Sequence, residues 1–167
     1  MKKFIFTVII LSVAGFTNAQ NIKLGHINST QLLSLMPETK GADSTLQKFG
    51  TQLENQLKTM SAEYESKVNS YKKDEASMAD PIKQARIKEI TDLEDRIQDF
   101  QQTAQQSIQK KKEELYSPII KKADEAIKAV AKDKGYTYIF DSSVGALLYA
   151  NDSDEILGLV KSKLGLK

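Results

Sequence analysis

The sequence predicts an α+β protein that is mostly α-helical, with a long antiparallel helical-hairpin (coiled-coil) arm projecting from a small β-rich oligomerisation body. Glycine is absent between Gly50 and Gly135, and long helices suit such a stretch because glycine is costly in a helix interior. Apolar residues recur every three or four positions on both sides of Pro81. Short segments rich in β-branched and aromatic residues lie at either end of this region.

Residues 1–19 have the three-part pattern of a secretory signal peptide. Lys2 and Lys3 precede an apolar run, and small or polar residues surround Ala19. The apolar run covers about 13 residues, whereas a membrane-spanning helix needs roughly 20, so an uncleaved anchor is the weaker alternative. We expect cleavage after Ala19 and export of the remaining chain. Cysteine is absent, which excludes disulfides, thiol chemistry and a lipid-modified cysteine after the signal.

Removal of the signal peptide would leave a chain without net charge. Lys2 and Lys3 would be lost, so 22 of the 24 basic residues would remain against 22 acidic residues. Binding to nucleic acid relies on basic residues that neutralise phosphates. The neutral chain is therefore not expected to bind nucleic acid.

The body is expected to begin with residues 20–42. The segment from Ile22 to Asn28 predicts a short strand, and the leucines that follow predict a small helix that ends at Pro37.

Residues 43–134 are expected to form the arm, with a turn near 77–81. Asp80 is suited to cap a new helix there, and Pro81 to occupy its first turn. Two helices joined by a short turn should pack antiparallel. The apolar stripe of the first helix is Leu46, Phe49, Leu53, Leu57, Met60, Tyr64, Val68 and Tyr71. That of the second is Ile87, Ile90, Leu93, Ile97, Phe100, Ala104, Ile108 and Leu115, continuing through Ile119, Ala123, Ile127 and Val130.

Pro118 falls inside the second helix, where a proline removes a backbone hydrogen bond. It predicts either a tolerated kink or a bend at which the arm leaves the body.

Residues 135–167 are expected to complete the body. Gly135 suits a helix C-cap, followed by a strand at 136–140, a turn, and a returning strand at 146–150. A last helix is expected to begin near Asp152, with Glu155 completing a capping box. The strands are apolar on both faces, so we expect other subunits to provide part of the cover that these faces need. The expected oligomerisation residues are Ile22, Leu24, Ile27, Tyr138, Phe140 and Leu148.

No catalytic, metal or cofactor site is expected. His26 is the only histidine, and without a cysteine it cannot belong to a His-rich metal site or a Cys/His pair. Neither a Gly-x-Ser-x-Gly nucleophile elbow nor a glycine-rich phosphate loop occurs. The carboxylates between Glu89 and Asp99 sit at helical positions where charges form a solvated face.

The arm tip is the remaining candidate for a functional surface. A charge run is usually a solvated face, but a basic tip could attract acidic partners or anionic lipid head groups. Met and Tyr are adaptable contact residues, and a two-helix arm cannot fully bury its stripes. The candidate contact residues are Met60, Tyr64, Val68, Tyr71, Met78, Lys67, Lys72, Lys73, Lys83 and Arg86.

The segments 24–29, 135–141 and 146–154, with a long charged helical pair between them, resemble the Skp (OmpH-like) family of periplasmic chaperones. In that family, strands from three subunits build a body whose helical arms enclose a cavity for unfolded outer-membrane proteins. The resemblance implies a homotrimeric, ATP-independent periplasmic holdase with such clients. The basic residues of the arm tip could add a weak contact with anionic lipid. Well-known members are strongly basic, so in this neutral chain we expect shape and apolar contact to outweigh charge. The alternative is a structural or adaptor coiled-coil protein of the cell envelope.

Overall fold

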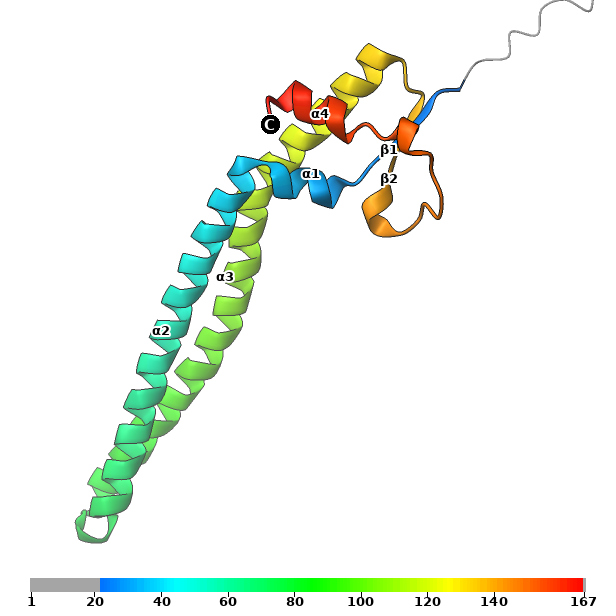
Figure 1. Cartoon of the computed structure of the whole chain (residues 1–167). Helices are drawn as coiled ribbons and strands as arrows, with labels where there is room; N and C mark the ends of the chain where they lie inside the picture. The colour runs from blue at the N-terminus through cyan, green and yellow to red at the C-terminus, as the bar shows by residue number, and fades with distance from the viewer. Residues whose placement is uncertain (1–21, 167) are drawn as a thin grey trace, which may run out of the picture.

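The computed structural model describes residues 22–166, and the expected signal peptide and its cleavage site lie outside them. Two long helices run side by side from a narrow tip to a body, where the remaining elements gather around the far end of the second helix (Figure 1). This arrangement confirms the mostly helical α+β fold with a long helical hairpin. The elements are β1 (Leu24–Ile27), α1 (Ser29–Leu35), α2 (Pro37–Asp74), α3 (Asp80–Lys134), β2 (Tyr138–Asp141) and α4 (Leu157–Leu164), with 3₁₀ turns at Glu75–Ser77, Ser142–Val144 and Asp152–Asp154.

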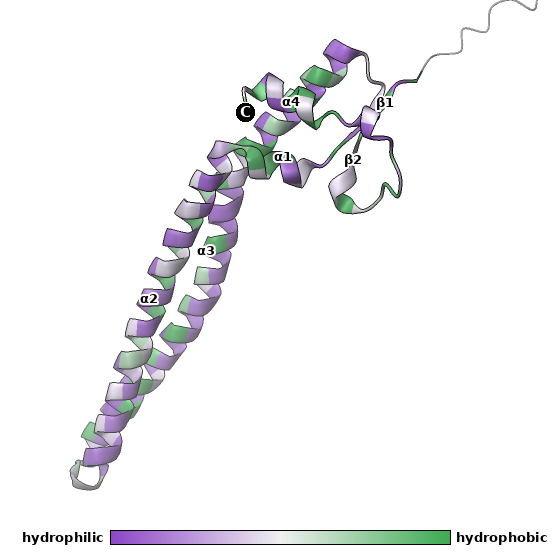
Figure 2. Ribbon diagram, viewed as in Figure 1, coloured by the Kyte–Doolittle hydropathy of each residue, from purple (hydrophilic) through white to green (hydrophobic). Residues whose placement is uncertain are grey.

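The arm consists of α2 and the part of α3 that packs along it. Most residues along both helices are hydrophilic, and apolar residues recur between them (Figure 2). Most of the α2 stripe is only half-buried, because a hairpin of two helices covers one side of each helix. Among the arm residues distant from the body, Met60 and Leu93 are the two large side chains that are buried. Among residues 22–166, no helix is long and apolar enough to cross a membrane.

Two expectations for the tip were wrong in detail. Ala79 occupies the N-cap position of α3, while Asp80 lies in the first turn and makes no capping hydrogen bond. Its carboxylate is still favourably placed, because the N-terminus of a helix attracts negative charge. Ile87 was assigned to the buried stripe but is 49% exposed. Ile90 and Leu93 face the partner helix, and no third helix of residues 22–166 covers the margin of the stripe where Ile87 lies.

α3 continues without interruption through Pro118. Pro118 lines a shallow hollow with Ala42 and Ile119, beside the first turns of α2. It therefore lies where the arm joins the body. Gly135 then ends α3 in the left-handed conformation with φ 69°, which confirms the expected glycine C-cap.

The core of the body lies between α1, α3, α4 and the inner face of the sheet. Its most deeply buried side chains are Leu32, Met36, Ile156 and Val160, which come from two separate parts of the chain. Alanines of α3 let the short helices approach closely. The core thus joins the N-terminal segment to the C-terminal helix across the base of the arm.

The sheet differs from the expected hairpin. β1 pairs in parallel with β2, and the register joins Leu24 to Tyr138 and Ile27 to Asp141. On its other edge, β1 bridges to Glu155, and the Ile156 amide donates to the His26 carbonyl over 3.0 Å.

The expected returning strand at 146–150 was wrong, because this segment is irregular. The 3₁₀ turn after β2 directs the chain over the outer face of the sheet, where the segment borders a hollow formed with Leu24, His26 and Phe140. It consequently pairs with no strand among residues 22–166.

The last helix also starts later than expected. Asp152–Asp154 form a separate 3₁₀ turn and α4 begins at Leu157, so the capping box does not form. The bridge between Glu155 and β1 holds the Glu155 backbone extended, with φ −73° and ψ 129°, and an extended residue cannot continue a helix.

Asp141 joins the end of β2 to the start of α1. Its carboxylate accepts hydrogen bonds from the Ser29 hydroxyl at 2.5 Å, the Ser29 amide at 3.2 Å and the Ser143 amide at 2.9 Å. Burial raises the pKa of this carboxyl, but the hydrogen bonds from Ser29 and Ser143 outweigh burial and lower the pKa to about 2. The charged form is therefore the one that the fold stabilises.

The first prediction concerns the arm. Leu93→Ala should lower the free energy of unfolding by about 2–5 kcal/mol, because Leu93 is 2% exposed and its removal leaves a cavity between the helices. Ile87→Ala on the same helix should cost less than about 1 kcal/mol. Urea unfolding followed by circular dichroism measures both. Equal losses would contradict the inward register assigned to α3.

The second prediction concerns Asp141. Asp141→Ala should cost about 1–3 kcal/mol at pH 7, because Ser29 and Ser143 lose their acceptor. Asp124→Ala is the control, since Asp124 makes a surface ion pair with Lys128.

The lowered pKa of Asp141 also predicts how stability depends on pH. Its contribution should be complete above about pH 4, the usual range of an aspartate, and should disappear as the pH falls to about 2. Urea unfolding from pH 7 to 2.5 should therefore show the wild type and Asp141→Ala converging in stability. A gap that stays constant down to pH 2.5 would contradict this role.

Candidate functional site

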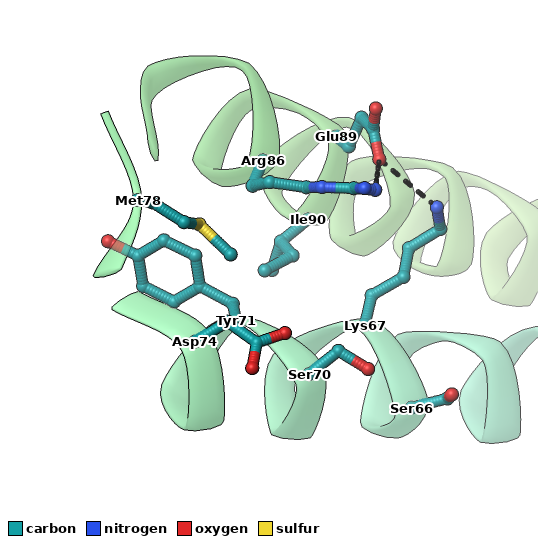
Figure 3. A pocket seen from close by; sticks show the side chains of 9 residues that line it. All are labelled: Ser66, Lys67, Ser70, Tyr71, Asp74, Met78, Arg86, Glu89 and Ile90. Carbon is teal, nitrogen blue, oxygen red and sulfur yellow. Dashed lines mark hydrogen bonds and ion pairs between the residues drawn. The ribbon is translucent and has the colours of Figure 1, made fainter. Parts of the chain in front are cut away.

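A groove of about 320 Å³ lies between the two helices near the arm tip (Figure 3). Tyr71 and Met78 approach from α2 and the turn, and Ile90 faces them from α3. Ser66, Ser70 and Asp74 add polar groups along the α2 side. The groove combines an apolar centre with a polar rim, and its centre is formed partly by the expected contact residues Tyr71 and Met78.

Charged side chains of the groove neutralise one another. Lys67 and Arg86 each lie 3.2 Å from the same oxygen of Glu89, and Figure 3 shows this oxygen between the two cations. The hydrogen bond and charge of Lys67, together with the charge of Arg86, lower the pKa of the Glu89 carboxyl. Asp74 lies across the groove and offsets the second cation. The groove therefore presents little net charge.

Tyr71 also makes a hydrogen bond at the tip. Its hydroxyl donates to the Glu75 carboxylate over 3.0 Å. Partial loss of hydration, followed by this hydrogen bond, raises the pKa of Tyr71. The ring is thereby oriented along the groove and remains neutral near physiological pH.

The other expected contact residues are distributed differently. Met60 is buried between the helices, whereas Tyr64 and Val68 are half-buried. Lys83 lies 3.9 Å from Asp80, while Lys72 and Lys73 are exposed and form no ion pair with any residue of the described chain. The expected basic patch at the tip is thus reduced to this lysine pair.

Sequence reasoning missed one exposed apolar residue at the tip. Ile82 is 52% exposed and lies one turn before Arg86 on α3. Its position outside the apolar stripe was the signal that could have identified it, because a large apolar residue off the stripe faces solvent in a two-helix arm. With Ile87, it extends the apolar surface of the tip along α3.

The second candidate surface is the outer face of the sheet. Leu24, Tyr138 and Phe140 point away from the core, and the rings of Tyr138 and Phe140 stack with centroids 6.5 Å apart. Tyr138 is 59% exposed. Ile22 precedes this face and is also exposed. Four of the six expected oligomerisation residues therefore lie together on or beside one face.

The remaining two oligomerisation residues lie elsewhere. The side chain of Ile27 points to the inner face of the sheet and is buried in the core of its own subunit. Leu148 lies in the irregular segment and is 97% exposed. Tyr149 beside it and Val144 in the preceding turn are also exposed, and the sequence reasoning did not name either of them as an oligomerisation residue. Five large apolar side chains in 138–149 thus face solvent in the subunit.

No group of three or more histidine, aspartate or glutamate side chains in residues 22–166 is placed to hold a metal ion.

Three comparisons bear on these surfaces. The family model described as outer membrane protein (OmpH-like) matches residues 23–164. Chaperone protein Skp of Vibrio cholerae serotype O1 (strain El Tor Inaba N16961) is 27% identical over 139 residues, which cover 81% of this chain and 82% of the relative. A Caulobacter crescentus CB15 protein, whose crystal structure is described as that of an OmpH-like outer membrane chaperone, superposes with a TM-score of 0.73. The match covers 92% of this chain and 90% of that protein at 15% identity, which shows a shared fold.

Proposed function

Because this chain belongs to the OmpH-like family of outer membrane proteins, we propose that it is an ATP-independent periplasmic holdase chaperone. It binds unfolded outer-membrane proteins in a cavity between helical arms and prevents their aggregation. In this proposal the signal peptide is cleaved after Ala19, residues 20–42 and 135–167 form the body, and residues 43–134 form the arm. The name of the Vibrio cholerae relative supports a chaperone role.

The observation that carries the proposal is the arm itself. α2 has 38 residues, which at about 1.5 Å per residue makes a helix of roughly 57 Å. Its apolar stripe is half-buried along most of this length, so apolar groups stay accessible at the margins. An unfolded β-barrel protein exposes apolar strands that pair with one another. Several such arms around one client would keep it from meeting another.

Assembly into a homotrimer would use the outer sheet face. A contiguous group of exposed apolar residues on a soluble subunit marks an interaction surface, and here it comprises Leu24, Tyr138 and Phe140 with Ile22 beside them. The edge of β2 opposite β1 has no partner strand in residues 22–166, and such edges favour pairing with another chain. Both features lie at the end of the molecule from which the arm projects (Figure 1).

The charges of the tip favour apolar over electrostatic capture. Lys67, Lys83 and Arg86 have acidic partners, which leaves Lys72 and Lys73 for a weak contact with anionic lipid. Independence from ATP agrees with a sequence that has no glycine-rich phosphate-binding loop.

The third prediction tests the proposed activity. When a denaturant-unfolded outer-membrane barrel protein is diluted in the presence of substoichiometric trimer, light scattering should fall well below that of the client alone. Raising the salt from about 50 to 500 mM should change this protection by less than about threefold, because apolar contact dominates. Unchanged scattering at low salt would overturn the holdase proposal. Capture of one native envelope protein in a pull-down would then favour an adaptor.

A variant pair locates this contact on the arm. Tyr71→Ser with Met78→Ser should weaken client binding severalfold, because both side chains form the centre of the tip groove. Lys72→Gln with Lys73→Gln is the matched control. It should reduce only the part of client binding that depends on salt concentration. A larger loss in the lysine pair would show that charge governs capture.

The fourth prediction tests the association face. Phe140→Asp should convert the assembly largely to monomer, since an unpaired carboxylate within an apolar interface is strongly destabilising. Ile87→Asp on the arm is the control, because it adds the same charge at an exposed apolar position remote from the sheet. Native mass spectrometry reports both. A trimer that persists in Phe140→Asp would exclude this face, and a monomeric wild type would overturn the proposed assembly.

A further inference from the structure

Leu148 is the most exposed large apolar side chain among residues 22–166, at 97%. The irregular segment 147–151 that carries it is nevertheless held in place. Nε2 of His26 donates to the carbonyl oxygen of Asn151 over 3.1 Å, because a carbonyl oxygen can only accept. The hydroxyl of Tyr149 lies 3.1 Å from the side-chain oxygen of Asn151. Leu148 is therefore presented to solvent at a defined position.

An apolar groove of about 440 Å³ lies on the inner side of the sheet, between α1, α3 and β2. All three elements contribute apolar side chains to it, namely Leu33, Ile120, Ile127 and Ile139. Ile120 is 51% exposed, and the other three are half-buried. The groove is thus a part of the body that one subunit leaves partly uncovered.

The charged groups of the groove already have partners within the subunit. Asp141 accepts hydrogen bonds from Ser29 and Ser143, and Asp124 forms an ion pair with Lys128 at 2.7 Å. A charged occupant would lose its hydration without gaining a free partner of opposite charge, which is costly. The groove therefore favours an uncharged, apolar occupant.

We propose that the groove takes Leu148 from a second copy of this chain, so that each subunit inserts this side chain between α1, α3 and β2 of a neighbour. Leu148 of the same subunit does not reach the groove, because segment 147–151 borders the outer face of the sheet and the groove lies on the inner side. The contact presupposes the proposed association through the outer sheet face and names what the neighbour supplies to it.

The sequence around Leu148 suits such an insertion. Ala146 and Ala150 lie two positions to either side of it, and residues two apart share one side of an extended chain. One large side chain thus stands between two small ones. The alternate residues, Leu147 and Tyr149, line a hollow on the subunit's own outer face. The edge of β2 opposite β1 has no partner strand in residues 22–166, which leaves backbone groups for the entering segment.

The proposed contact has consequences for symmetry and for the arm. Segment 147–151 and the groove are different surfaces, and head-to-tail contacts between unlike surfaces close into rings when the rotation allows it. Such a ring is compatible with the proposed trimer. Ile120 follows Pro118 by two positions, where the arm joins the body. The leucine of the neighbour would therefore pack against the base of the arm and help to fix its direction.

The test uses disulfides, because the wild-type chain has no cysteine that could interfere. Leu148→Cys with Ile120→Cys in the full mature chain should give covalent dimers and trimers on mild oxidation, seen by denaturing electrophoresis without reductant. A leucine in the groove brings these positions within disulfide reach. Leu148→Cys with Ile82→Cys is the matched control and should give few, since Ile82 is 52% exposed at the arm tip.

The outcome separates this contact from the assembly as a whole. No disulfide, or a disulfide within one subunit, in a chain that native mass spectrometry shows to be trimeric would overturn the insertion of Leu148 and leave the proposed trimer intact. A wild type that is monomeric would overturn the proposed assembly and this contact with it.

A second measurement does not depend on cysteine geometry. Leu148→Ser should raise the protein concentration at which half of the assembly dissociates by about tenfold or more, measured by sedimentation, because each subunit loses one buried leucine. Ile82→Ser is the control and should change this concentration by less than about twofold. An unchanged concentration in Leu148→Ser would overturn the contact. Loss of client protection by Ile120→Asp with an intact trimer would also overturn it and would assign the groove to clients.

Discussion

The parallel pairing of β1 with β2 is the contact on which the rest of the molecule depends. It joins the two ends of the described chain: Ser29 and Asp141, which contact each other at the end of this pair, are 112 positions apart. The arm is formed by the chain between these two strands, so α2 begins and α3 ends at the body. The approach is close: a Cβ on Gly25 would lie 2.9 Å from the Tyr136 ring, over which Lys23 makes a cation–π contact at 4.1 Å. Glycine at position 25 lets the ring of Tyr136 lie against the strand.

The same pairing creates two unlike faces. Because side chains alternate along a strand, the register that buries Ile27 and Ile139 against the helices directs Leu24, Tyr138 and Phe140 outward. The inner face is covered within the subunit by α1, α3 and α4, whereas the outer face is bordered by the irregular segment 147–151. One short sheet thus closes the subunit and leaves an apolar face for another chain. In the proposed trimer, folding and assembly would depend on the two sides of the same four-residue strands.

Local patterns predicted the arm well and the body less well. The apolar stripes that include Leu53, Met60 and Leu93 follow the helical period. This spacing is a local property of the sequence and does not depend on residues far away in the chain. The start of α4 could not be predicted, because Glu155 is kept extended by β1, which lies far away in sequence. The segment 146–150 has the composition of a strand but pairs with no strand among residues 22–166, and composition cannot supply a partner. The prediction that Ile87 is buried was wrong for a related reason. The helical period gives the position of Ile87 on the helix but not how far the partner helix covers it.

The candidate site was likewise predicted only in those features that depend on local sequence. Residue type alone identified Tyr71 and Met78, which border the tip groove, but could not show that Lys67 and Arg86 share Glu89 or that Met60 is buried. Those facts depend on how α2 and α3 are aligned across the hairpin. They also limit how the proposed holdase could work. Cations already paired have little to gain from an acidic client, and half-buried side chains offer only small apolar areas each. Retention would then come from many weak contacts along several arms, which leave the client mobile and able to fold after release.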